Sequence, residues 1–244
     1  MEARINQNRV LIDQLIPISI IRSQTMKWAV DIIIVIVFSL LVALSAQVAF
    51  RIPTTTVPIT GQTFGVLLTG GVLGSKRGAS SLFLYMIFGM IGMPVFAPNF
   101  SKVLTDTNFH FIFPWHGHSS TIWESSGFLT MTSGGYIIGF ILAAYVVGLL
   151  AEKGWNRKPR ISLALLIGNL LVYVVGLPWL AYIISTNSGV YDYIAGSNVL
   201  DKTLKGGLYP FIGGDAVKLV FAGLALPGVA TLVRRLKFDD DNDS

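Results

Sequence analysis

The sequence predicts an all-α integral membrane protein with six transmembrane helices and with both termini in the cytoplasm. The first observation behind this prediction is composition: 52% of the 244 residues are hydrophobic, 13% are charged, and the mean hydropathy is +0.65. Soluble domains carry about a quarter charged residues, so this composition is typical of a membrane protein. The second observation is that Lys and Arg gather in short clusters between long apolar stretches.

Six apolar runs are candidate spans, and five of them are clear. The first, 28–50, has 23 residues. As a helix it would extend about 34 Å, enough to cross a hydrocarbon core of about 30 Å. The second, 61–74, is short and rich in Gly and Thr. The remaining runs are 78–96, 134–151, 161–184 and 210–233.

The basic residues give an independent test of the short second span. If the N-terminus is cytoplasmic and all six spans cross, 13 of the 18 Lys and Arg residues lie in inner segments and four in outer segments. Cytoplasmic loops carry the excess of Lys and Arg, so this distribution supports six spans. Leaving out the second span would destroy the alternation. The inner segments are 1–27, 75–77, 152–160 and 234–244.

The chain is therefore predicted to have three parts: a cytoplasmic N-terminal segment 1–27, a membrane domain 28–233 with a long outer loop 97–133, and a cytoplasmic acidic tail 234–244. The N-terminal segment alternates apolar and basic residues and is expected to form a helix on the membrane surface. The outer loop contains His110, His116 and His118. We expect an aromatic lid there and no metal site, because no carboxylate spacing accompanies the histidines.

Asp215 and Lys218 lie three residues apart in the last span. A charged side chain at membrane depth costs about 2.5 to 3.5 kcal/mol on insertion scales, so such residues usually have a role. Residues i and i+3 share a helical face. Two interpretations are open: an ion pair that ties the last span to its neighbours, or a polar binding site. In the second, Asp215 accepts hydrogen bonds from ligand N–H groups and Lys218 donates to a ligand oxygen.

Other polar and small residues fall at the same predicted depth, in the outer half of the membrane. They are Thr60 and Gln62 at the start of the second span, Gly135 and Tyr136 at the start of the fourth, and Trp179 near the end of the fifth. A Trp at this depth is more often a membrane anchor than a ligand contact. The inner halves contain mainly Leu, Ile, Val and Ala. This asymmetry predicts a cavity that opens to the outside.

Four motifs occur in order along the chain: VPITGQTFGVLLTGGVLG, YMIFGMIGMPVFA, GGYIIGF and PFIGGDAVK. Over roughly residues 55–97 and 134–225 the sequence resembles the BioY family, the biotin-binding S components of energy-coupling-factor (ECF) transporters. The resemblance implies a six-helix S-component bundle for high-affinity biotin binding and uptake across the bacterial cytoplasmic (inner) membrane. It also implies a transmembrane coupling protein and two cytosolic ATPases as partners. This chain contains no G-x-x-x-x-G-K-[ST] nucleotide loop of its own.

The resemblance also implies which residues bind biotin: Asp215, Lys218, Gln62, Thr60, Tyr136, Gly135 and Trp179. A carboxylate suits the N–H donors of the biotin ureido group, and Lys218 suits either the ureido oxygen or the biotin carboxylate. Gln62 and Thr60 could equally bond to the backbone of a broken helix. No cofactor is expected.

The first span carries small residues at three- and four-residue spacing, among them Ser39, Ala43 and Ala46. Small residues allow helices to approach closely. The resemblance implies that these three dock the coupling protein, and ordinary packing of the span within the chain is an equal alternative.

Two other functions are alternatives to biotin uptake, and two further ones are not expected. An S component for another small vitamin is an alternative on the same scaffold. A proton-coupled secondary transporter using Asp215 is a second, although the sequence shows no inverted repeat. An enzyme is not expected, because the spans contain no Ser–His pairing, H-E-x-x-H motif or paired carboxylates. Nucleic acid is not an expected partner, because the basic residues form no continuous face.

Overall fold

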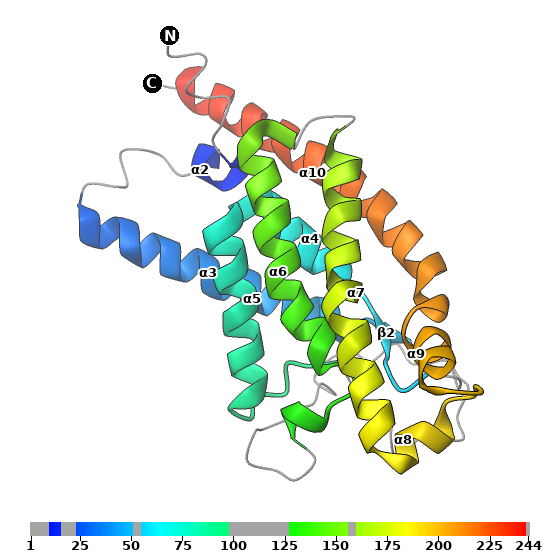
Figure 1. Cartoon of the computed structure of the whole chain (residues 1–244). Helices are drawn as coiled ribbons and strands as arrows, with labels where there is room; N and C mark the ends of the chain where they lie inside the picture. The colour runs from blue at the N-terminus through cyan, green and yellow to red at the C-terminus, as the bar shows by residue number, and fades with distance from the viewer. Residues whose placement is uncertain (1–9, 16–22, 51–54, 98–126, 156–159, 243–244) are drawn as a thin grey trace.

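The computed structural model describes residues 10–15, 23–50, 55–97, 127–155 and 160–242. This part of the chain is a bundle of helices (Figure 1). Its longer helices are α3 (Gln24–Gln47), α4 (Gln62–Leu73), α5 (Ser75–Met90), α6 (Gly134–Leu150), α7 (Arg160–Thr186) and α10 (Tyr209–Asn242). The shorter elements are α2 (Leu11–Leu15), α8 (Ser188–Tyr193), α9 (Val199–Gly207), the 3₁₀ helix η2 (Phe128–Thr130) and the π-helical turn η3 (Ala151–Trp155). Two short strands, β1 (Ala49–Phe50) and β2 (Ile59–Thr60), pair antiparallel.

The all-α class is confirmed, and each predicted span coincides with one longer helix. Among the described residues, four helical stretches are long and apolar enough to cross a membrane: Gln24–Gln47, Gly134–Trp155, Arg160–Thr186 and Val199–Gly228. Helices α4 and α5 are shorter, with 12 and 16 residues. At about 1.5 Å per residue, α4 is about 18 Å long, less than the hydrocarbon core of about 30 Å. The sequence therefore located these two helices correctly, although neither meets the length of an independent span.

Gly74 separates α4 from α5 and sets where the first ends and the second begins. Its φ of 83° is in the left-handed region, which ends one helix and lets the next begin at Ser75. A Cβ at Gly74 would also lie 2.6 Å from a carboxylate oxygen of Glu152. That carboxylate accepts hydrogen bonds from the backbone N–H and the hydroxyl of Ser75, at 2.7 and 2.8 Å. The turn is thereby tied to the end of α6.

Helix α6 is the centre of the bundle and packs against α4, α5 and α7. Glycines allow these close contacts: a Cβ at Gly139 would lie 2.9 Å from the carbonyl oxygen of Val172 on α7. A Cβ at Gly70 of α4 would lie 2.7 Å from the carbonyl oxygen of Ala144 on α6. Small residues at helix contacts are the usual means of tight packing in membrane bundles. One end of this central helix also forms part of the wall of a cavity.

Helix α3 crosses α5 at a steep angle (Figure 1), and its small residues face into the chain. Ser39, Ala43 and Ala46 are 0%, 3% and 0% exposed. Its exposed face instead carries large apolar side chains: Ile33, Val37, Leu40 and Leu44. Burial of the three small residues favours packing within the chain over docking of a partner, because a buried side chain presents no surface.

Helix α2 docks at the end of the bundle where the C-terminal part of α10 lies (Figure 1). Leu11 of α2 is buried in a cluster with Leu73 and Leu226. Arg77 of α5 forms ion pairs with Asp13 of α2 and, at 2.8 Å, with Asp31 of α3. The predicted surface helix over 1–27 is helical at 11–15 and from residue 24 onward, and residues 1–9 and 16–22 lie outside the described part. Helix α10 runs to Asn242, so most of the predicted acidic tail is helical.

Elements α8, α9 and β2 lie at the opposite end of the bundle (Figure 1). Lys202 of α9 is buried and donates hydrogen bonds to the carbonyl oxygens of Tyr191 and Ile194, at 2.7 and 2.6 Å. Thr55 donates to the carbonyl oxygen of Gly206 in α9. These bonds connect the segment before β2 with α9 and close that end of the bundle. The predicted outer loop falls largely in 98–126, so its histidines lie outside the described residues.

Candidate ligand-binding site

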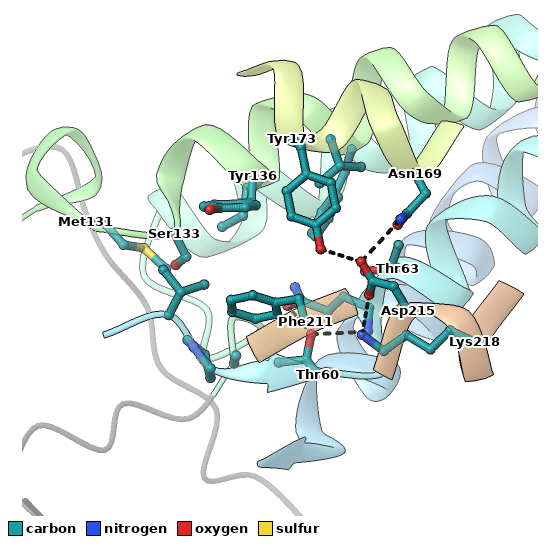
Figure 2. Close-up of a pocket in the computed structure, with 17 residues that line it drawn as sticks. Thr60, Thr63, Met131, Ser133, Tyr136, Asn169, Tyr173, Phe211, Asp215 and Lys218 are labelled. Atoms are coloured by element: carbon teal, nitrogen blue, oxygen red, sulfur yellow. Dashed lines mark hydrogen bonds and ion pairs between the residues drawn. The ribbon is translucent and has the colours of Figure 1, made fainter. Parts of the chain in front are cut away.

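A cavity of about 40 Å³ lies beside β2, and Figure 2 shows the side chains that line it. Such a volume has room for a few water molecules. Residues from β2, α4, α6, α7 and α10 line it, together with the segments before β2 and before α6 and with Ala97 after α5. The polar lining consists of Thr60, Gln62, Thr63, Ser133, Tyr136, Asn169, Tyr173, Asp215 and Lys218, and the apolar lining includes Val57, Ile137, Phe140, Val172 and Phe211.

Asp215 of α10 is 5% exposed, and three donors converge on its carboxylate (Figure 2). Lys218 Nζ lies 3.0 Å from Oδ1. Asn169 Nδ2 donates to Oδ2 at 3.2 Å, and the hydroxyl of Tyr173 donates to the same oxygen. A buried carboxylate is stable in its charged form when it is paired and hydrogen-bonded in this way. The predicted sharing of one helical face by Asp215 and Lys218 is confirmed.

Lys218 is the cationic group of the cavity, and its side chain is 15% exposed. An ammonium group has three N–H donors. Asp215 takes one of them, which leaves two that can reach a ligand oxygen. The pair therefore presents donors as well as acceptors on one wall.

Thr60 and Gln62 stand where β2 leads into α4. The hydroxyl of Thr60 donates to Gln62 Oε1 at 2.8 Å and accepts from the backbone N–H of Gln62 at 3.2 Å. Gln62 Nε2 donates to the hydroxyl of Tyr85 at 2.6 Å. The two side chains are thus held in place by each other and by Tyr85, and Thr60 also satisfies a backbone group at the start of α4. Gln62 keeps a second N–H of its amide available.

Tyr136 of α6 lines the cavity and donates its hydroxyl to the carbonyl oxygen of Gly207 at 2.9 Å. Gly135 and Trp179, by contrast, do not line it within the described part of the chain. A Cβ at Gly135 would lie 2.2 Å from the Cβ of Trp179. The indole N–H of Trp179 donates to the carbonyl oxygen of Met131 at 2.9 Å. These two residues pack behind the wall and hold the segment before α6, so five of the seven predicted residues meet at the cavity.

Sequence reasoning missed Asn169 and Tyr173, both on α7. They are four residues apart, on one helical face, and both donate to Asp215. The signal was present, because Asn169 interrupts the apolar run ISLALLIGNLLVYVV. A polar side chain inside a membrane helix is rarely without a partner or a function. The aromatic wall residue Phe211 was also missed, since nothing in its local sequence distinguishes it from a lipid-facing residue.

The model of the BioY family matches residues 19–116 and 121–235, which is most of the chain. The chain belongs to the BioY family. It is 32% identical to the biotin transporter BioY of Thermotoga maritima over 192 residues, covering 77% of this chain and 88% of that protein. It is also 32% identical to a probable biotin transporter BioY of Pyrococcus horikoshii over 194 residues, covering 80% and 92%.

The fold has a counterpart among solved structures. The crystal structure of the S-component for biotin from an ECF-type ABC transporter aligns with a TM-score of 0.58 and 22% sequence identity. The alignment covers 88% of this chain and 94% of that one. At this level of identity the likeness establishes a shared fold. Helix α2 precedes the first residue of the BioY family match, so its docking is an addition to the part that the family model describes.

Proposed function

We propose that this BioY-family protein binds biotin with high affinity in the cavity beside Asp215 and is the substrate-specific component of an ECF-type uptake transporter. The observation that carries the proposal is the Asp215–Lys218 pair, which places acceptors and donors together on one wall of a cavity with aromatic side chains. Two relatives that align with more than three quarters of the chain are named a biotin transporter and a probable biotin transporter. The family is one of transporters, so the protein acts in transport and is not an enzyme.

The chemistry of biotin matches this lining. Its ureido group offers N–H donors to Asp215, and its oxygen atoms can accept from the two remaining N–H groups of Lys218. Its apolar bicycle and tail suit the rings of Tyr136, Phe140 and Phe211. Nanomolar affinity corresponds to about −12 kcal/mol. For roughly 16 heavy atoms this is ~0.75 kcal/mol per atom, within the limit for a small ligand.

A cavity of about 40 Å³ is smaller than biotin, so binding requires part of the wall to move outward. Among the described lining residues, those outside the long helices lie in the segments 55–60 and 131–133 and at Ala97. Loops and strand ends move more readily than packed helices. We infer that one or both of these segments open when the ligand enters.

The proposal also includes an orientation in a bacterial cytoplasmic membrane, with six crossings in the domain 28–233. The 13 basic residues of the inner segments support cytoplasmic termini. Strand β2, which lines the cavity, lies at the other end of the bundle from α2 (Figure 1), so in this orientation the cavity faces outward. The chain has no nucleotide-binding loop, and we propose that a transmembrane coupling protein and two cytosolic ATPases supply the energy for uptake.

The structural alternative is that the pair only ties α10 to α7 through Asn169 and Tyr173. Biotin binding by the purified protein, compared with an Asp215→Asn, Lys218→Met double variant, separates the two. The matched control is the double variant Asp201→Asn, Lys205→Met. It removes an ion pair within α9 that is 2.8 Å long and more exposed than the Asp215–Lys218 pair. Tight binding by the parent and the control, lost in a folded cavity variant, supports the proposal. A folded parent that does not bind biotin contradicts it.

A further inference from the structure

Asn169 carries an unpaired, buried acceptor in the wall of the cavity. The residue is 6% exposed and lines the cavity, and its Nδ2 donates to Asp215 Oδ2 at 3.2 Å. An ionised carboxylate can only accept hydrogen bonds, so the amide has to turn its NH₂ group toward Asp215. Its carbonyl oxygen, Oδ1, then points away from the carboxylate. Within the described part of the chain, this buried oxygen has no hydrogen-bond partner.

A buried acceptor without a partner costs free energy, and such atoms are rare in folded proteins. In a cavity this arrangement is informative, because a ligand donor removes the cost when it binds. The neighbouring acceptor Gln62 Oε1 already receives the hydroxyl of Thr60. Of these two amide oxygens at the cavity wall, the one of Asn169 therefore has more to gain from a ligand N–H.

The number of hydrogen bonds that Asp215 can accept supports the same conclusion. A carboxylate has about four lone-pair sites. Lys218, Asn169 and Tyr173 already use three of them. One site remains, whereas a cyclic urea brings two N–H donors. Asp215 alone cannot accept both.

We propose that Asn169 is a second specificity-determining residue of the site: its Oδ1 accepts one N–H of the ureido ring, and Asp215 accepts the other. This inference rests on the proposed function, since it assigns the donors of the same ligand. It makes the site selective for ligands with two ring N–H donors. A lactam, which has one, leaves either Asp215 or Asn169 unsatisfied, and sites built for a donor discriminate strongly against analogues that lack it.

The test uses biotin and two lactam analogues, each with one ureido N–H replaced by CH₂. The parent protein is expected to bind each analogue roughly 10-fold or more weakly than biotin. Asn169→Leu should bind biotin more weakly and should lose discrimination against one analogue while keeping it against the other. Asn169→Ala, which removes the same acceptor with a smaller side chain, gives the same readout if the Leu variant does not fold.

Tyr173→Phe is the matched control, because Tyr173 donates to the same oxygen of Asp215 but is not proposed to accept from the ligand. This variant should lower the affinity for biotin and for both lactam analogues by a similar factor. If the Asn169 variants behave like Tyr173→Phe, or lose discrimination against both analogues together, Asn169 acts only by holding Asp215 and the inference is overturned. In that case the parent protein still binds biotin. If the proposed function itself is wrong, the parent binds neither biotin nor either lactam analogue.

Discussion

Tyr173 donates its hydroxyl to Oδ2 of Asp215, and this hydrogen bond joins α7 to α10 at the wall of the cavity. Hydrogen bonds to charged groups contribute more than neutral ones, because the charge strengthens them in a buried setting. The same bond therefore has two effects. It stabilises the contact between two helices, and it fixes the orientation of the carboxylate that the proposed ligand uses.

Replacing Tyr173 by Phe is expected to lower the free energy of unfolding by about 1.5 to 3 kcal/mol, since a charged acceptor loses a donor. Thermal unfolding of the purified protein in detergent measures this. Tyr182→Phe is the matched control: Tyr182 lies on the same helix and is 63% exposed. Equal unfolding temperatures for the two variants would show that the bond to Asp215 contributes little.

Gly135→Ala is expected to weaken biotin binding although Gly135 does not line the cavity. The added Cβ would lie 2.2 Å from the Cβ of Trp179, so α6 or α7 has to shift. Such a shift moves Tyr136 and the segment that Trp179 holds. Titration of biotin should show a loss of roughly 10-fold or more, since small misplacements at a site are costly. Gly213→Ala, whose Cβ meets no described atom within 4 Å, should bind like the parent. Parent-like affinity of the first variant would contradict the supporting role of this contact.

Thr55→Val is expected to raise the rates of both association and dissociation of biotin. The change removes the hydrogen bond from Thr55 to the carbonyl oxygen of Gly206, which connects the segment before β2 with α9. If that segment opens for the ligand, a weaker closure speeds passage in both directions. Stopped-flow binding measures the two rates. Thr186→Val, which removes a hydroxyl bonded within its own helix, is the control. Unchanged rates in Thr55→Val would place the opening elsewhere in the wall.

Arg77→Gln is expected to lower stability without changing biotin affinity. Arg77 pairs with Asp13 and Asp31, whose side chains are 34% and 26% exposed. Because these ion pairs are neither fully exposed nor fully buried, we expect them to contribute about 1 to 2 kcal/mol to the free energy of unfolding. Thermal unfolding measures the loss, and the exposed neighbour Lys76→Gln is the control. A large change in affinity would show that the two ends of the bundle are coupled.

The proposed orientation predicts opposite labelling of two single-cysteine variants. The chain contains no cysteine, so each introduced thiol reports one position. In intact cells, Ser188→Cys at the start of α8 should react with a membrane-impermeant thiol reagent. Lys76→Cys at the start of α5 should react only after the membrane is opened. Reaction of both from the same side would exclude the predicted crossing pattern.

Span positions followed from the sequence because hydropathy is a property of contiguous residues. Helix α6 at Gly134–Leu150 and the predicted run 134–151 nearly coincide. The Asp215–Lys218 pair was equally local, since i and i+3 meet on any helix. The short second run was also found, although its length of 12 helical residues is below that of an independent span.

Contacts between helices depended on how the bundle packs, and there the sequence was insufficient. Gly135 lies near the start of α6 and Trp179 in the second half of α7, but the way the two helices meet turns these residues toward each other and away from the cavity. Ser39, Ala43 and Ala46 have the pattern of a docking face, yet the crossing of α3 over α5 buries them.

Asn169 shows the same division most clearly. Its polarity within an apolar run was visible in the sequence, whereas its partner was not. The hydrogen bond to Asp215 spans 46 residues of chain, and only the approach of α7 to α10 brings the two side chains together. Periodicity and charge act over a few residues and so identify helices and their depth. Which side chains converge depends on the rotation and crossing of each helix, and those are set by packing among all of them.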